Sequence, residues 1–167
     1  MTAAPEVRPH GQYLRAVSGT FYRAVDPRHL GTALAGSRQP GRYSPPGAPA
    51  LYLSSSPEGV QTAMIAHGDA RTPELNIIEV RVHAERVLDL RDEASCRAAG
   101  VRVDDAIAPW QQAAAEGGDP PPWSVRRHLE ALGSYGVIDP SRRRPGLWHL
   151  ALFRWNEAGT PQARVQG

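Results

Sequence analysis

The segment GRYSPPGAPALYLSSSPEG, residues 41–59, changes character twice along its length. Its first part is rich in glycine and proline, which interrupt regular structure and favour irregular loops. Residues 50–54, ALYLS, have the apolar and aromatic composition of a buried strand. Ser56, Pro57 and Glu58 then provide an N-cap, a proline suited to the first helical position and an acid in the first turn. The segment therefore predicts a loop that leads into a strand and then into a helix.

The elements predicted on either side of this segment give the fold class. Strands are predicted at residues 19–25, 50–54, 75–82, 87–90, 136–138 and 149–155. Helices are predicted at residues 26–34, 56–67, 92–99, 104–116 and 123–132. Helices and strands do not alternate as they do in βαβ repeats, so the sequence predicts an α+β fold with most of its helices in the middle of the chain. The long irregular loop at 36–49 is of a kind that is often functional.

Length and composition predict one domain. The chain has 167 residues, 41% of them hydrophobic, which is enough to bury a core. We expect a flexible N-terminal tail at 1–11, a domain at 12–158 and a C-terminal tail at 159–167. The N-terminus lacks the apolar stretch of a signal peptide, and the chain has no apolar run of about 18 residues, so a cytoplasmic protein is expected.

Charge and the reactive residue types exclude several kinds of site. The basic residues number 19, all arginine, against 17 acidic residues, and the net charge of +2 does not predict nucleic-acid binding. Without lysine the chain has no Schiff-base or P-loop lysine. The single cysteine, Cys96, is interpreted as a structural thiol. The six histidines are scattered, and the sequence predicts no metal site.

Five residues are candidates for a binding site: Arg23, Arg42, Tyr43, Tyr52 and Ser141. Each has an ordinary structural explanation on its own, as a solvated arginine, a core tyrosine or a turn serine. Together they suggest a dinucleotide site, because two guanidinium groups can hold a pyrophosphate and tyrosine rings offer flat faces to a base. The Rossmann fingerprint G-x-G-x-x-G is absent, so such a site would be of another type.

Three blocks of the sequence resemble the RES domain family. They are GTFYRAV at 19–25, GRYSPPGAPALYLSSSPEG at 41–59 and IDPSRRRPGLWHLALF at 138–153. The resemblance implies a fold like that of ADP-ribosyltransferases and a toxin of a toxin–antitoxin pair, neutralised by an Xre-like antitoxin. It also implies that NAD is the substrate and that the nicotinamide–ribose bond is cleaved by phosphorolysis, hydrolysis or ADP-ribosyl transfer.

The resemblance also implies roles for individual residues. Arg23, Arg42, Tyr52 and Ser141 match family positions and would be catalytic as well as NAD-binding. Tyr43 takes the aromatic place beside Arg42 and would contact NAD. His149 stands where the family has an asparagine and would also contact NAD.

One family residue has no counterpart, since its glutamate falls at Ala63 or Ala66. A carboxylate there would stabilise the positive charge that develops on the ribose as the bond to nicotinamide breaks. Three alternatives remain. Glu58 or Glu79 takes over this role, His149 repositions the chemistry, or the site binds NAD without efficient cleavage.

Two other functions stay open at this stage. A RES-like module could bind a nucleotide or a protein partner without turnover, and a nuclease could use Arg142, Arg143 and Arg144. Following the family, an antitoxin would insert a segment near the loop at 36–49. A homo-oligomer is possible, and no membrane or direct nucleic-acid partner is expected.

Overall fold

The computed structural model describes residues 3–61 and 75–167. Seven strands form one sheet in the order β1-β2-β3-β6-β5-β4-β7, and β2 also pairs with β4. This additional pairing makes the sheet curl round until β4 returns to β2. The strands are β1 Glu6–His10, β2 Leu14–Val25, β3 Leu51–Ser54, β4 Asn76–Asp89, β5 Gly136–Pro140, β6 Trp148–Leu152 and β7 Gln162–Gln166.

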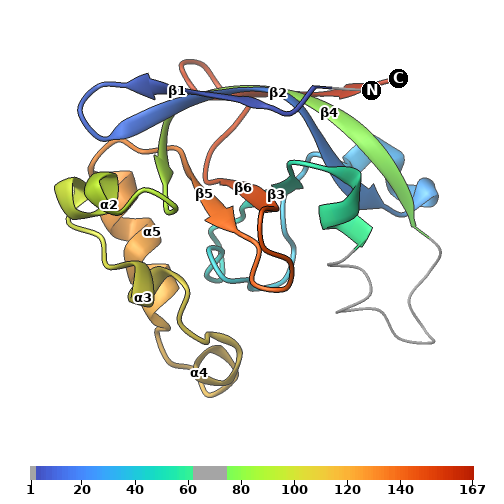
Figure 1. Cartoon of the computed structure of the whole chain (residues 1–167). Helices are drawn as coiled ribbons and strands as arrows, with labels where there is room; N and C mark the ends of the chain where they lie inside the picture. Colours follow the sequence, from blue (N-terminus) through green and yellow to red (C-terminus); the bar gives the residue numbers. More distant parts are fainter. Residues whose placement is uncertain (1–2, 62–74) are drawn as a thin grey trace.

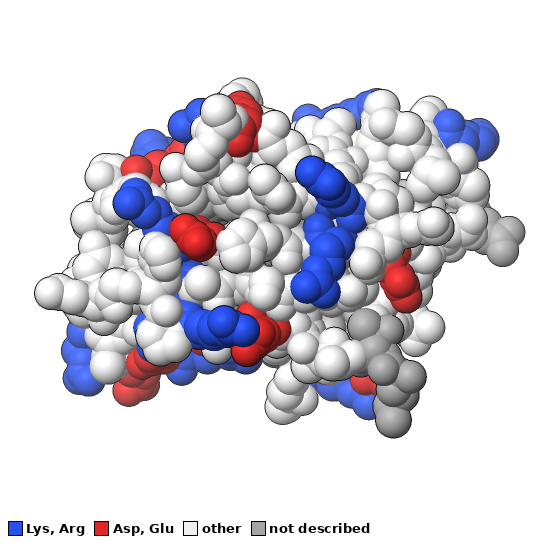
Figure 2. Space-filling model, turned by 90° about the horizontal axis from the view of Figure 1, so that it is seen from above, with Lys and Arg blue, Asp and Glu red and all other residues white. Residues whose placement is uncertain are grey.

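The curled sheet has two walls (Figure 1). The upper wall consists of β1, β2, β4 and β7, and the lower wall consists of β3, β6 and β5. Apolar side chains from both walls meet in one core, among them Phe21, Val80 and Leu150. The outer face of the upper wall carries several charged side chains among uncharged ones (Figure 2). Arg81 and Arg164 are exposed cross-strand neighbours on β4 and β7.

The helices lie mainly on the outer side of the lower wall. They are α2 Glu93–Ala99, α3 Val103–Ala106, α4 Gln111–Ala115 and α5 Pro121–Ala131, and a 3-10 helix, η1, covers Pro27–Thr32. Cys96 of α2 and Leu129 of α5 pack with Val137 of β5 and Ala151 of β6 in a second core. Burial raises the pKa of the Cys96 thiol to about 11, as expected for a structural cysteine.

The α+β class predicted from the sequence is confirmed, and so are most of the predicted elements. The strand at 19–25 is the second half of β2, and residues 57–61 are helical, directly after Ser56. The rest of the predicted helix at 56–67 lies outside the described residues. No helix in the described part of the chain is long and apolar enough to cross a membrane.

The structure differs from the sequence prediction in the middle of the chain. The predicted helix at 104–116 is two short helices, α3 and α4, with Pro109 between them, because proline cannot continue a helix. The strands predicted at 75–82 and 87–90 are one strand, β4, whose direction changes near Arg86, a residue with a φ of 59°.

Both predicted tails contain a strand. Residues 6–10 form β1, which pairs with β2, and residues 162–166 form β7, which pairs with β4. The prediction of loose tails was wrong for these residues. Their largely polar composition suits edge strands, which are exposed and need few apolar residues.

Candidate functional site

The loop at 41–44 folds tightly onto Tyr52 of β3. The backbone N–H of Tyr43 donates to the Tyr52 hydroxyl at 3.0 Å, and the Ser44 and Tyr52 hydroxyls share a hydrogen bond at 2.8 Å. A Cβ at Gly41 would lie 2.6 Å from the Ser44 Oγ and 2.8 Å from the Tyr52 hydroxyl. A larger residue at the start of this turn would therefore force Ser44 or Tyr52 to shift. Burial raises the pKa of Tyr52, so its hydroxyl stays neutral.

Arg126 of α5 holds the rest of this loop. Its Nη1 donates to the carbonyl oxygens of Tyr43 at 2.8 Å, Ala48 at 2.7 Å and Pro49 at 2.9 Å. Its Nη2 donates to the carbonyl of Phe153 at 3.3 Å, and the residue is only 3% exposed. These bonds satisfy buried carbonyl groups of an irregular segment that belongs to none of the named strands.

Sequence reasoning did not identify Arg126 as a site residue, although a signal was present. Trp123, Arg126 and Leu129 follow one another at a spacing of three, and all three are buried on one side of α5. An arginine on the apolar side of an amphipathic helix indicates a buried set of acceptors. The indole N–H of Trp123 also donates to the Gly41 carbonyl at 2.8 Å.

Arg42 and Tyr43 both donate to backbone carbonyls at the end of α3 or just after it, and they differ in burial. Tyr43 is 1% exposed, its hydroxyl donates to the Ala106 carbonyl at 3.3 Å, and burial raises its pKa. A ring buried to this extent offers no face to a ligand, so Tyr43 anchors the loop and the NAD contact predicted for it does not fit. The half-buried Arg42 donates to the Ala108 carbonyl at 2.6 Å. Burial and the nearby Arg142 lower the pKa of Arg42.

Arg23 holds the junction between the two walls. β2 and β3 share a single partner pair, Tyr22 with Ser54, and then separate. Arg23 donates through Nε to the Ala33 carbonyl at 3.0 Å and through Nη1 to the Tyr52 carbonyl at 2.9 Å. It thereby replaces a backbone partner that Tyr52 loses where the strands diverge. Burial lowers the pKa of Arg23.

A row of polar side chains crosses the outer face of the lower wall. Asp139 of β5 lies opposite His149 of β6, and His149 lies opposite Ser54 of β3. The Ser54 Oγ and the His149 Nδ1 share a hydrogen bond at 2.9 Å. Burial lowers the pKa of His149 below its ordinary 6.5, so its ring is neutral at physiological pH. The row thus places a hydroxyl, a neutral imidazole and a carboxyl group side by side.

Asp139 is the buried acid of this row. The residue is 7% exposed, and Arg142 donates to its carboxylate at 3.2 and 3.4 Å. Burial raises the pKa of Asp139, while the positive charges of Arg142 and Arg42 act against this rise. The carboxylate in turn influences Arg42, Tyr52 and His149 electrostatically, so these groups share one electrostatic environment.

Ser141 begins an exposed turn that continues the row. Its backbone N–H donates to the Leu147 carbonyl at 2.9 Å, and its hydroxyl accepts from the Arg144 backbone N–H at 3.3 Å. Arg142, Arg143 and Arg144 are exposed in this turn. The turn therefore brings positive charge to the edge of the site.

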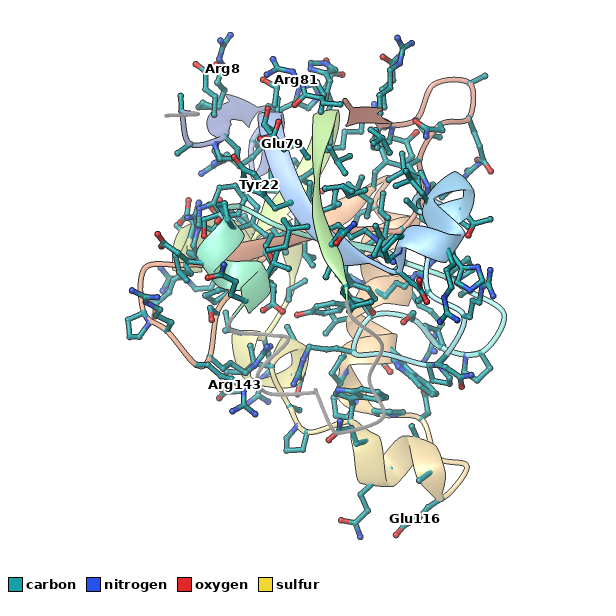
Figure 3. The ribbon with its side chains drawn as sticks, turned by 90° about the vertical axis from the view of Figure 1, so that its right-hand side faces the viewer. Arg8, Tyr22, Glu79, Arg81, Glu116 and Arg143 are labelled. Carbon is teal, nitrogen blue, oxygen red and sulfur yellow. The ribbon has the colours of Figure 1, made fainter. Side chains whose placement is uncertain are left out.

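The two acids that the sequence suggested as substitutes for the family glutamate, Glu79 and Glu58, lie in different parts of the structure. Glu79 is exposed on β4 of the upper wall, where Figure 3 shows it near Arg81 and far from Arg143. Glu58 is exposed in the helical residues 57–61. Positions 63 and 66, where the family glutamate was sought, lie outside the described residues.

The helical residues 57–61 approach the polar row closely. A Cβ at Gly59 would lie 3.3 Å from the Ser54 Cβ and 3.6 Å from the His149 Cε1. Sequence reasoning missed Ser54 and Asp139 as members of this site. Ser54 could have been found from alternation, because Tyr52 and Ser54 share one face of a strand.

Of the predicted site residues, Arg42, Tyr52 and His149 thus gather around Asp139, and Ser141 lies two positions beyond it. Arg23 and Tyr43 support this arrangement through backbone contacts. The site combines two guanidinium groups, neutral hydroxyl and imidazole groups, and one buried carboxyl group. Such a set can bind an anionic ligand and accept hydrogen bonds from its hydroxyl groups.

Comparison with known proteins identifies the family. The fold is similar to that of a chain in the crystal structure of the M. tuberculosis MbcT–MbcA toxin–antitoxin complex, with a TM-score of 0.54 and 20% sequence identity. This similarity covers 89% of the present chain and 84% of the other. A comparison with curated proteins found no match. The sequence matches the RES domain over residues 2–167, and the chain therefore belongs to the RES domain family.

Proposed function

We propose that this chain is a RES-type toxin that binds NAD and cleaves its nicotinamide–ribose bond. The observation that carries the proposal is the cluster of Arg42, Tyr52 and His149 around the buried Asp139, in a chain that matches the RES domain along its length. NAD is a pyrophosphate with two ribose units, and the cluster offers cations for the first feature and hydrogen-bonding groups for the second.

In this proposal Arg42 and Arg142 hold the pyrophosphate. Both lie close enough to Asp139 to influence its pKa, and each guanidinium can form paired, charge-assisted bonds with phosphate oxygens. Arg23 does not contact the ligand in this proposal and positions Tyr52 through the hydrogen bond to its carbonyl. Tyr52 lies beside the nicotinamide riboside, and Ser141 donates a hydrogen bond to it.

The reaction is a displacement at the C1′ atom of the nicotinamide ribose. The bond between C1′ and the pyridinium nitrogen breaks, and its electron pair returns to that nitrogen, so neutral nicotinamide leaves. Water or phosphate forms the new bond to C1′, and an attacking water releases a proton to the solvent. His149 is neutral at physiological pH and is suited to orient the attacking group.

An antitoxin is the expected partner. The structurally similar chain comes from a toxin–antitoxin complex. Because the loop at 41–49 borders the proposed site, a protein segment inserted beside it would exclude NAD. We propose that a cognate, Xre-like antitoxin neutralises the chain in this way.

The proposal is tested by incubating the purified protein with NAD, with and without phosphate, and separating the products by chromatography. Nicotinamide should be released, and phosphate dependence of this release would identify phosphorolysis. Tyr52→Phe and Arg23→Ala should each reduce release. NAD binding without nicotinamide release would contradict cleavage and favour the alternative of a binding module without turnover.

A further inference from the structure

Two buried aspartates of this fold have the same exposure and different partners. Asp89, at the end of β4, and Asp139, in β5, are each 7% exposed, and each pairs with an arginine close in sequence. Asp89 accepts hydrogen bonds of 2.9 Å from the backbone N–H, Nε and Nη2 of Arg91. Its carboxylate is therefore well occupied by a local turn.

Asp139 is held much more loosely. Its bonds from Arg142 are 3.2, 3.4 and 3.4 Å long, whereas charge-assisted bonds of this type are usually about 2.7–2.9 Å. An ionised carboxylate has roughly four acceptor sites, so capacity remains for a better donor. The side chain of Arg142 is 38% exposed and can move toward a ligand, which would release Asp139 further.

The surroundings of Asp139 identify the donor that it suits. It lies opposite His149 in the polar row. Among the described residues, the titratable groups whose charges interact with it include Arg42, Arg142, Tyr43, Tyr52 and His149. A ligand whose phosphates are held by the two arginines would bring its ribose hydroxyl groups near this row. Ribose hydroxyls are donors that a carboxylate can accept.

Resting on the proposed function, we propose that Asp139 is a catalytic residue that accepts a hydrogen bond from the nicotinamide ribose and stabilises the positive charge that develops there. The residue forms no covalent bond and takes up no proton in the step. Its negative charge stabilises the positive charge on the ribose while the C1′–N bond breaks. Because that positive charge is largest in the transition state, the stabilisation acts mainly there.

Glu79 is a poor alternative for this role. Successive cross-strand pairs connect Glu79 to His149 across the sheet. Glu79 pairs with Tyr22, Tyr22 with Ser54, and Ser54 with His149. Neighbouring strands are about 4.8 Å apart, so Glu79 is three strands from His149, while Asp139 is on the next strand. The curl of the sheet also turns Glu79 outward on the upper wall (Figure 3).

The experiment compares nicotinamide release by the wild-type protein with that by Asp139→Asn, Asp139→Glu and Asp89→Asn. Asp139→Asn should lower kcat by about 100-fold while KM for NAD changes less than about threefold, because the lost interaction belongs to the transition state. Asp139→Glu keeps the charge and should recover part of kcat. Asp89→Asn makes the same chemical change at the same burial and should lower the thermal midpoint without lowering kcat.

The outcomes separate the two proposals. If Asp139→Asn folds as well as the wild type and keeps its kcat within about twofold, the role of Asp139 is wrong although NAD cleavage stands. If Asp139→Asn does not fold, kcat is compared between Asp139→Glu, which keeps the charge, and Asp139→Ser, which removes it. Equal kcat values would overturn the role of Asp139. A higher kcat for Asp139→Glu would support it. If the wild-type protein releases no nicotinamide, both proposals fail.

Discussion

Two loops border the candidate site, and they are built in opposite ways. The loop at 41–49 has little regular structure, yet Tyr43 and Ser44 are each 1% exposed and Arg126 donates to three carbonyl groups within it. The turn at 141–147 has hydrogen bonds between its own residues, 2.9 to 3.3 Å long, and exposes three arginines.

The difference shows how a small domain can build a precise site from irregular chain. The first loop is fixed by buried polar contacts, so it can serve as a rigid wall behind Tyr52. The second turn keeps its charged groups in solvent, so they can adjust to a ligand. We therefore expect substitutions of the buried residues that fix the first region to act on stability, and substitutions of the exposed arginines in the second to act on binding.

Replacing Arg126 should have the largest effect. Arg126→Met would leave the carbonyls of Tyr43, Ala48 and Pro49 without their buried donor, and we expect a loss of about 3–5 kcal/mol in the free energy of unfolding. Arg127→Met, one position along α5, removes an exposed ion pair with Asp119 and should cost less than about 1 kcal/mol. Urea unfolding of both variants measures the difference. Equal stabilities would show that Arg126 does not hold the loop.

Gly41→Ala should have an intermediate effect. The new Cβ would lie 2.6 Å from the Ser44 Oγ and 2.8 Å from the Tyr52 hydroxyl, so the turn must shift. We expect a loss of about 1–3 kcal/mol in stability, accompanied by lower nicotinamide release. Gly31→Ala is the matched control, because nothing lies within 4 Å of its added Cβ and the stability should hardly change. A Gly41→Ala protein as stable and active as the control would contradict the tight packing of this turn.

His149 should give a smaller, pH-dependent effect. Burial holds its pKa in the folded state below 6.5, so its contribution to stability is complete above pH 6.5 and is lost as pH falls through the folded-state pKa. The raised pKa of Asp139 acts in the opposite direction, and comparison with His149→Asn removes it from the result. The thermal midpoint of the wild type should fall more than that of His149→Asn between about pH 7.5 and 5.5. Parallel pH profiles would show that the ring is not buried in its neutral form.

Arg143→Gln should have the smallest effect on the fold. The side chain is exposed in the turn, and we expect a change within about 0.5 kcal/mol in stability. Chemical denaturation checks this prediction, and a large loss would show that the turn is fixed as firmly as the loop at 41–49.

Much of the fold could be predicted from local sequence. The Ser56-Pro57 helix start and the strands around residues 19–25 and 50–54 depend on capping, composition and alternation within a few residues. The strands at 6–10 and 162–166 were missed because an edge strand is held by backbone pairing with the neighbouring strand. Such a strand needs few apolar residues of its own.

The site was predictable only in part, for a related reason. Sequence motifs identified Arg42, Tyr52 and His149. Asp139 belongs to the site because the register of β5 against β6 places it opposite His149. Arg126 gains its significance from the loop that α5 faces, at a distance of 77 or more positions in sequence. Long-range pairing of this kind leaves little trace in a single sequence.

Nicotinamide release by the wild type, Arg42→Gln and Arg81→Gln tests the central claim most directly. Loss of a charge-assisted bond is worth about 1.5–3 kcal/mol, so Arg42→Gln should lower kcat/KM for NAD by about 10- to 100-fold. Arg81→Gln, on the outer face of the upper wall, should match the wild type. A wild type that releases no nicotinamide, or an equal loss in both variants, would contradict NAD cleavage at this site.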